Sequence, residues 1–240
     1  MDSKIAKYLR LQNNPVAVLW ADSMPTSAIH FIENKWGCVV ALIKAASKGR
    51  ITAATSSTTV CRGGKAGFGF KRHEQGRIEY FLSNGNSNME RCERYKKTPE
   101  LAWSAISKMP DIHTGNCIVF KPLSMVEESE KPLCVIFMVN ADQLSGLTTL
   151  ANFDQDDTVA VRFASGCAQA VLYPIAAEEN GEKTCYIGMT DPSARKVIDK
   201  EQLSFSIPYS RFLEMEQNAD ESFLITDTWE TIQKRISKGI

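Results

Sequence analysis

The sequence lacks the features that mark membrane, secreted and nucleic-acid-binding proteins. None of its apolar runs approaches the roughly 20 residues that a membrane-spanning helix needs. Its first residues, MDSKIAKYLRLQNN, carry charges where a secretory signal has an apolar core. Lys plus Arg and Asp plus Glu both number 28, so no net charge attracts nucleic acid or an anionic membrane surface. We expect a soluble, cytoplasmic protein that binds neither nucleic acid nor membrane.

Common catalytic motifs are absent as well. The chain has no Gly-x-Ser-x-Gly and no His-Glu-x-x-His, which disfavours classical hydrolase and zinc-protease chemistry. Residues 64–69, GKAGFG, are not a Walker loop, because no Gly-Lys-Ser/Thr closes the spacing, and they lack the third glycine of a dinucleotide fingerprint. The three histidines are scattered and are expected to be surface or capping residues. The sequence therefore leaves open whether the protein is an enzyme.

Cysteine, by contrast, is plentiful, but the cysteines are spread singly along the chain. The chain has seven cysteines and no Cys-x-x-Cys, which argues against a disulfide framework, a zinc ribbon and a ferredoxin run. Cys117 and Cys134 lie in apolar runs and are expected to be small buried hydrophobes. A reduced, cysteine-rich chain would also suit an organism that lives without oxygen.

The segment TSSTTVCRGGKAGFGF, residues 55–70, is the most distinctive stretch. Glycine allows a backbone to approach a ligand closely, and successive backbone N–H groups can bind an anion. We predict that Arg62, Gly63, Gly64 and Lys65 contact a cofactor or ligand. If a helix follows Cys61 or Cys167, its positive end lowers the pKa of the thiol and favours thiolate, the form that binds metal.

Hydrophobic periodicity and turn residues predict alternating strands and helices. The chain is expected to be α/β, with α+β as the alternative, and to contain a mixed sheet. Predicted strands are 15–21, 51–55, 77–83, 116–122, 133–139, 158–165, 184–189 and 203–208, and predicted helices are 3–11, 38–47, a segment starting at Thr98, a segment capped by Asn140, a segment from 165 to 173, 210–216 and 222–236.

The second half of the chain resembles the first half in sequence. PVAVLW from Pro15 resembles PLCVIF from Pro132, and Cys61 precedes Tyr80 by the same 19 residues that separate Cys167 from Tyr186. Either the chain contains an internal duplication or generic strand–helix–strand units coincide. We predict two similar halves, 1–126 and 132–240, joined by polar residues 127–131 and packed into one compact domain. In a duplicated chain, Cys61 and Cys167 would occupy equivalent corners and converge on one pocket.

Nine segments together resemble domain-of-unknown-function family 169, a group of uncharacterised archaeal and bacterial proteins, many from anaerobes. These segments, which run from the first half to the end of the chain, are CRGGKAGFGF, FLSNGN, ERYKKTPELA, FKPL, NADQLSGLTTLANF, ASGCAQA, GMTDPSARK, LSFSIP and MEQNADESFL. The resemblance covers Pro15 to Trp229 and implies no particular reaction. The family's Cys-x-Gly-Gly and Gly-Cys patterns are matched at Cys61 and Cys167, whereas Cys92 stands where a glycine is expected.

Three functions remain open at this point. The first is an iron–sulfur cluster or other thiophilic metal held by Cys61, Cys167 and Cys38, in a protein that serves a redox partner. The second is metal-free binding of a small anionic metabolite by the glycine-rich segment with Arg62, Lys65 or Arg195. The third is a thiol nucleophile at Cys61, for which the sequence shows no base. Homo-oligomerisation is expected on general grounds.

Overall fold

The structure is a computed structural model that describes residues 1–85, 92–156 and 159–238. The chain forms two compact units: unit 1 comprises Met1–Phe70 and Ile112–Ile240, and unit 2 comprises Lys71–Asp111. This division differs from the predicted halves 1–126 and 132–240. Strands before and after residues 127–131 pair in one sheet, and the two predicted halves stay a prediction.

Unit 1 is built on a seven-stranded mixed sheet, which confirms the predicted α/β class. The strand order is β2-β3-β1-β4-β7-β6-β5. Neighbouring strands are antiparallel except for β5 and β6, which are parallel. The strands are β1 (Val16–Ala21), β2 (Thr52–Thr55), β3 (Cys117–Pro122), β4 (Cys134–Val139), β5 (Val161–Phe163), β6 (Cys185–Gly188) and β7 (Leu203–Pro208).

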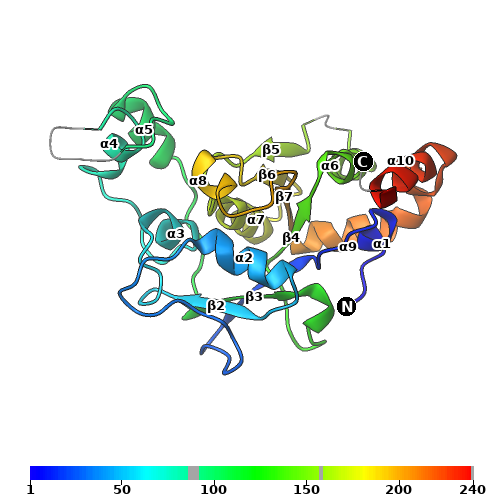
Figure 1. Ribbon diagram of the computed structural model, residues 1–240, viewed down its shortest axis with the longest axis horizontal. Coiled ribbons are helices and arrows are strands. Elements are labelled where there is room, and N and C mark those ends of the chain that lie inside the picture. Colours follow the sequence, from blue (N-terminus) through cyan, green and yellow to red (C-terminus); the bar gives the residue numbers. More distant parts are fainter. Residues whose placement is uncertain (86–91, 157–158, 239–240) are drawn as a thin grey trace. The chain divides into compact units, whose positions relative to one another are not determined.

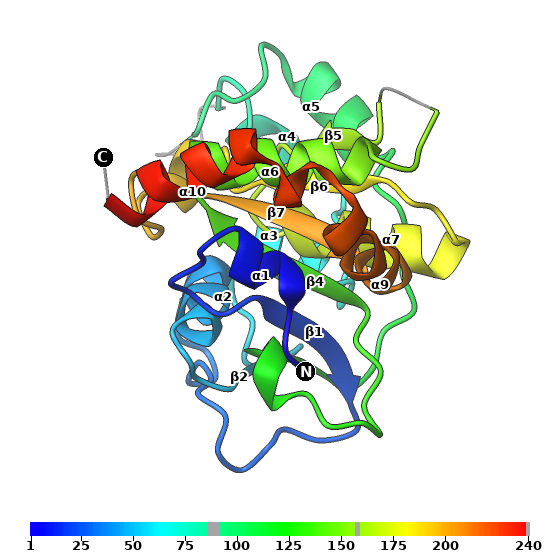
Figure 2. The same ribbon diagram turned by 90° about the vertical axis from the view of Figure 1, so that its right-hand side faces the viewer.

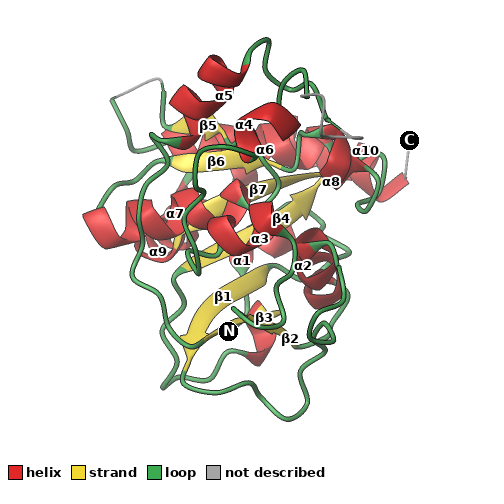
Figure 3. Ribbon diagram, turned by 90° about the vertical axis from the view of Figure 1, so that its left-hand side faces the viewer, coloured by secondary structure: helices red, strands yellow, loops and turns green. Residues whose placement is uncertain are grey.

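Helices cover both faces of this sheet (Figures 1 and 3). One face packs against α2 (Val39–Ser47) and α7 (Gln169–Asn180), with α3 (Arg62–Gly67) and α8 (Pro192–Arg195) nearby. The other face, toward the viewer in Figure 2, packs against α1 (Lys4–Tyr8), α6 (Ala141–Asn152), α9 (Tyr209–Asn218) and α10 (Asp227–Lys238). Short 3-10 helices, η1 (Leu123–Met125), η2 (Ala219–Glu221) and η3 (Phe223–Ile225), complete the connections. No helix in the described part of the chain is both long and apolar enough to cross a membrane.

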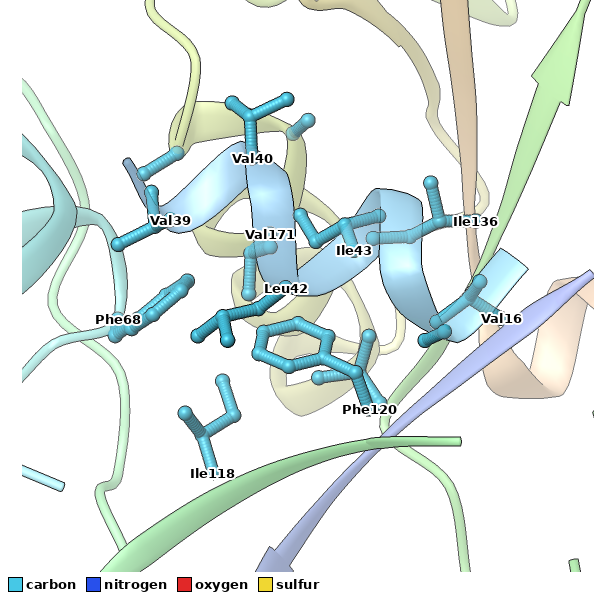
Figure 4. Packing of buried hydrophobic residues seen from close by; sticks show 14 of the residues in the cluster. Val16, Val39, Val40, Leu42, Ile43, Phe68, Ile118, Phe120, Ile136 and Val171 are labelled. Carbon is cyan, nitrogen blue, oxygen red and sulfur yellow. The ribbon is translucent and has the colours of Figure 1, made fainter. Parts of the chain in front are cut away.

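The core on the α2 face fixes the position of α2 against the central strands. Leu42 and Ile43 of α2 lie over Ile118 and Phe120 of β3, and Val171 of α7 reaches into the same cluster (Figure 4). All five side chains are almost completely buried. Burial of a large aliphatic or aromatic side chain contributes about 1.5–3 kcal/mol, so this cluster anchors α2 and α7 on the sheet.

Local sequence accounts for the helix starts. Ser3 caps α1, Thr98 caps α5 (Pro99–Ile106) with Pro99 in the first turn, and Asn140 forms a reciprocal capping box with Gln143. These three starts confirm the sequence predictions.

The predicted strand 77–83 is wrong, because this segment of unit 2 contains the helix α4 (Ile78–Phe81). Its apolar and aromatic residues are typical of strands, yet the buried Glu79 accepts a hydrogen bond from the Gly76 N–H at 2.6 Å. Glu79 thereby satisfies a backbone donor just before the helix, and α4 packs against α5 within unit 2.

The four central strands repeat one arrangement. Val16 of β1 pairs with Pro122 of β3, and Cys134 of β4 pairs with Pro208 of β7. Since β1 and β4 also pair antiparallel with each other, a local two-fold axis through the sheet would superimpose one pair on the other. In this register Val16 is equivalent to Cys134. The sequence alignment of Pro15 with Pro132 instead matches Val16 to Leu133, one residue earlier.

The helices do not follow this symmetry throughout. Helix α2 follows β1 and helix α6 follows β4, but α2 and α6 pack on opposite faces of the sheet. The internal duplication therefore stays a prediction.

Candidate functional site

The hydroxyl run that precedes Cys61 forms a tight turn at the end of β2. The Thr58 Oγ1 accepts a hydrogen bond from the Thr55 N–H at 2.9 Å, and the Thr59 Oγ1 donates to the Thr55 carbonyl at 2.8 Å. The turn delivers Cys61 to the N-cap of α3, where its Sγ accepts a bond from the Gly64 N–H at 3.4 Å. The hydroxyl side chains thus position the thiol.

Two glycines of α3 allow this helix to approach α2 and α7. A Cβ atom on Gly64 would lie 2.3 Å from the Val39 Cγ1. A Cβ atom on Gly67 would lie 2.2 Å from the Ala168 Cβ and 2.8 Å from the Ala168 carbonyl oxygen. Val39 follows Cys38, and Ala168 follows Cys167. The glycine-rich segment therefore brings the start of α3 against the segments that carry the other two predicted cysteines.

Cys38, Cys61 and Cys167, called here the thiol site, each lie just before a helix and are all half-buried. Cys38 is the N-cap of α2, and Cys167 precedes Ala168, the N-cap of α7. The helix that the sequence predicted after Cys167 is present. The structure thus places the three predicted metal ligands together in unit 1.

The electrostatics of the thiol site differ from the sequence expectation. Burial raises the pKa of the Cys167 thiol, and the neighbouring charges of Asp191, Cys61 and Cys38 raise it further. Burial also raises the pKa of Cys38, while the backbone N–H groups of Val40 and Ala41 oppose this rise. The expected lowering at Cys167 is wrong, because desolvation of the thiolate outweighs the favourable helix end. The thiols of Cys38 and Cys167 are therefore protonated near neutral pH.

Asp191 is an electrostatic neighbour of Cys38 and Cys167, and sequence reasoning missed it as a site residue. It is the N-cap of α8 and is only 6% exposed. Its Oδ2 accepts hydrogen bonds from the Ala194 N–H at 3.1 Å and from the Ser193 hydroxyl. Its Oδ1 is buried and has no hydrogen-bond partner. The sequence Asp-Pro-Ser signals a helix cap, but nothing in it signals a buried, unpaired oxygen.

The predicted cationic residues are placed differently. Arg62 is exposed and Lys65 half-buried, and neither side chain has a hydrogen bond or ion pair to the described residues. A Cβ on Gly63 would meet no atom within 4 Å, so open space borders this part of α3. The Arg195 guanidinium donates to the backbone carbonyls of Lys200 and Gln202, which holds it within its own segment.

The remaining cysteines have surroundings that differ from those of the thiol site. Cys117, Cys134 and Cys185 are fully buried in strands, as predicted for the first two, and burial raises the pKa of Cys185 to about 12. Cys92 belongs to unit 2. A cavity of about 420 Å³ lies beside α1, lined by residues up to Pro15 with Leu123 and Ser124, and contains none of the predicted site residues.

Within residues 1–85, 92–156 and 159–238, no three His, Cys, Asp or Glu side chains are arranged so that they could hold a metal ion as they stand. The three cysteines of the thiol site and the nearby Asp191 come from four segments of unit 1.

Comparisons with known proteins place the chain in a family without giving it a function. No curated protein and no solved structure matches it significantly. The sequence profile of the DUF169 family, described as "Uncharacterised ArCR", matches residues 4–218. The matched range contains the thiol site, Asp191 and all seven strands of the sheet. The chain therefore belongs to the DUF169 family, as its motifs led us to expect.

Proposed function

We propose that the protein binds an iron–sulfur cluster through Cys38, Cys61 and Cys167. The observation that carries this proposal is the convergence of three half-buried thiols, each on a different segment of unit 1, on one site. The Gly64 N–H already donates to the Cys61 sulfur. Such N–H groups stabilise the negative charge of cysteine-bound clusters and tune their reduction potentials.

A cluster suits this site better than a single ion does. Sulfur ligands of one zinc ion lie about 4 Å apart, because each Zn–S bond is about 2.3 Å. A cluster places its own iron and sulfide atoms between the cysteines and so fits thiols that do not already share one metal position. Because burial keeps Cys38 and Cys167 protonated, their protons must leave when the cluster binds.

The surroundings of the site suit a redox role. Trp36 and Val60 are 73% and 38% exposed, and they lie within two residues of Cys38 and Cys61 in the sequence. Exposed apolar side chains next to two cluster ligands would let a redox partner approach the site closely.

The first prediction concerns iron content. Protein purified without oxygen is expected to contain iron and acid-labile sulfide, both of which the variant C38A/C61A/C167A should lack. The matched control is Cys92→Ala, which removes a half-buried cysteine of unit 2 and should leave the iron content unchanged. The measurement is colorimetric iron and sulfide analysis together with the absorption spectrum.

The proposal fails if anaerobic protein, after incubation with ferrous iron and sulfide, holds neither element. It also fails if the triple variant keeps as much of both as the unaltered protein does.

A second candidate is the binding of a small anionic metabolite without metal. The observation in its favour is that Arg62 and Lys65 have no partner among the described residues and border the open space beside Gly63. The iron and sulfide analysis also distinguishes the two candidates. Anaerobic protein that holds neither iron nor sulfide would exclude the cluster and favour metal-free metabolite binding.

A further inference from the structure

Unit 1 contains a cavity that is lined by none of the thiol-site residues. It has a volume of about 420 Å³ and lies beside α1, the helix nearest the N-terminus in Figure 2. Sites for small organic molecules are usually cavities of about 300–1,000 Å³ with apolar walls and a few polar groups. The apolar lining includes Leu11, Pro15 and Leu123, and the polar lining includes Arg10 and Asn13.

Arg10 has a backbone conformation that favours glycine. Its φ is 51°, in the left-handed region, at the point where α1 ends in a Schellman motif. In this motif the Arg10 N–H donates to the Lys7 carbonyl at 3.1 Å, and the Leu11 N–H donates to the Ala6 carbonyl at 3.0 Å. Glycine usually occupies this position, because other residues are strained there. The presence of arginine therefore points to a use for its side chain.

The end of α1 does not need a cationic side chain. The Tyr8 carbonyl accepts hydrogen bonds from the Trp229 Nε1 at 3.1 Å and from the Gln233 Nε2 at 2.7 Å. The Leu9 carbonyl accepts a hydrogen bond from the Gln143 Nε2 at 3.1 Å. Together with the two bonds of the Schellman motif, these contacts satisfy the last four carbonyls of the helix end.

The positive charge of Arg10 is not paired within the protein. No described residue gives its guanidinium a hydrogen bond or an ion pair, whereas Lys7, the other cationic side chain of the lining, pairs with Asp2 at 3.4 Å. The Asn13 Oδ1 accepts from the Lys48 Nζ at 2.8 Å, and the Asn13 Nδ2 has no partner in the described part of the chain. The lining side chains thus carry one excess positive charge and unpaired hydrogen-bond donors.

We propose that this cavity binds a small organic anion, a carboxylate or a phosphate ester, through the Arg10 guanidinium. The planar guanidinium donates two parallel hydrogen bonds to either kind of anionic group. The Asn13 amide supplies a further donor, and the apolar lining contacts the carbon skeleton of the ligand. The strained backbone of Arg10 is then explained by binding, since strained conformations cluster at ligand sites.

The experiment titrates the full chain, labelled with ¹⁵N, and follows the amide signals by NMR. The probes are glycerol 3-phosphate, succinate and, as the neutral probe, glycerol. Arg10→Gln removes the charge, and Arg10→Gly removes the side chain while suiting the left-handed backbone. Arg162→Gln is the matched control, because Arg162 is an exposed arginine of β5 that does not line the cavity.

At least one of the two anions is expected to shift the signals of residues 10–14 with a Kd of about 1 mM or lower, and glycerol is expected to leave them in place. Arg10→Gln and Arg10→Gly should weaken binding by about tenfold or more, because charge-assisted hydrogen bonds are lost. Arg162→Gln should bind as the unaltered protein does. Arg10→Gly should also melt at the same or a higher temperature, which would separate binding from a structural role.

The proposal is overturned if neither anion shifts these signals at about ten times that concentration, or if glycerol shifts them as strongly. It is also overturned if Arg10→Gln binds as tightly as the unaltered protein. Binding that is lost in Arg62→Gln and kept in Arg10→Gln would place the anion beside the glycine-rich segment and would likewise overturn it. Should Arg10→Gly be unstable, the affinity of Arg10→Gln decides. The outcome is independent of the proposed cluster, because no cysteine of the thiol site lines the cavity.

Discussion

At the scale of single residues, the glycines of α3 have separate uses. Gly64 and Gly67 are sites of close helix contact, whereas Gly63 borders open space. The sequence indicated that glycine served close approach, and it suggested a ligand as the approaching partner. In the structure, the atoms that approach Gly64 and Gly67 belong to Val39 and Ala168.

Gly67→Ala is therefore expected to destabilise the protein by about 1–3 kcal/mol, because the new methyl group would overlap the Ala168 backbone and force α3 away from α7. Gly63→Ala, in the same helix, should be neutral or stabilising by about 0.5–1 kcal/mol, because alanine favours the helix and the methyl group meets nothing. Urea unfolding of the two variants measures the difference. Equal stabilities would contradict the close packing of α3 on α7.

Some residues of the site could be predicted from the sequence and others could not. Cys61 and Cys167 were recognisable because glycine and small polar residues surround them in the sequence. The raised pKa of Cys167 and the buried oxygen of Asp191 depend on which segments pack over them, and that information lies in tertiary contacts far along the chain.

At the scale of elements, a buried arginine joins α9 to the end of α6. Arg211 is 1% exposed, and its Nη1 donates to Asp154 and Glu214 at 2.8 and 2.7 Å. Its Nη2 donates to the Ala151 carbonyl at 3.1 Å, in the last turn of α6, where a cation is favoured. The hydrogen bonds from Arg211 hold the pKa of Asp154 well below its usual range.

Asp154→Asn should lower the free energy of unfolding by about 1.5–3 kcal/mol at neutral pH, the usual contribution of hydrogen bonds to charged groups. In the unfolded chain the pKa of an aspartate is about 4, so the folded state binds fewer protons than the unfolded state as the pH falls. The stabilisation by Asp154 is therefore complete above about pH 5 and is lost progressively below about pH 4.

Denaturant unfolding from neutral to acid pH checks this, and the gap between unaltered protein and Asp154→Asn should close toward acid pH. Asp199→Asn is the control, since its exposed ion pair with Lys44 contributes less than about 1 kcal/mol. A gap that stays constant down to about pH 3 would show that the pKa of Asp154 is not lowered in the folded protein.

Element prediction succeeded where one local signal decided the outcome, as at the capped starts of α1, α5 and α6. It failed at 78–81, where apolar spacing favoured a strand and the Glu79 hydrogen bond and packing on α5 gave a helix. The register of the apparent repeat was missed by one residue, because proline alignment does not specify which residues pair across strands.

At the scale of the whole molecule, the two segments on either side of residues 127–131 share one sheet and its core. β1 pairs with β4, and the hydrophobic clusters on both faces draw residues from both segments. A cut between them would expose an unpaired strand edge on each piece.

A protease site placed at the exposed Glu128–Ser129 bond should therefore give a nicked protein that elutes as one species in gel filtration. Its fragments should separate only in denaturant, while a denaturing gel confirms that the chain is cut. Separate elution of the fragments in native buffer would mean that the segments fold independently.

The wide spacing of the thiol-site cysteines along the chain has a consequence for thermal stability. Residues 38, 61 and 167 are far apart in the sequence, so the proposed cluster would be a cross-link that closes long loops. Such a cross-link reduces the freedom of the unfolded chain and so raises the resistance of unit 1 to heat. If the proposed cluster binds there, its loss in air would also lower the melting temperature of the protein.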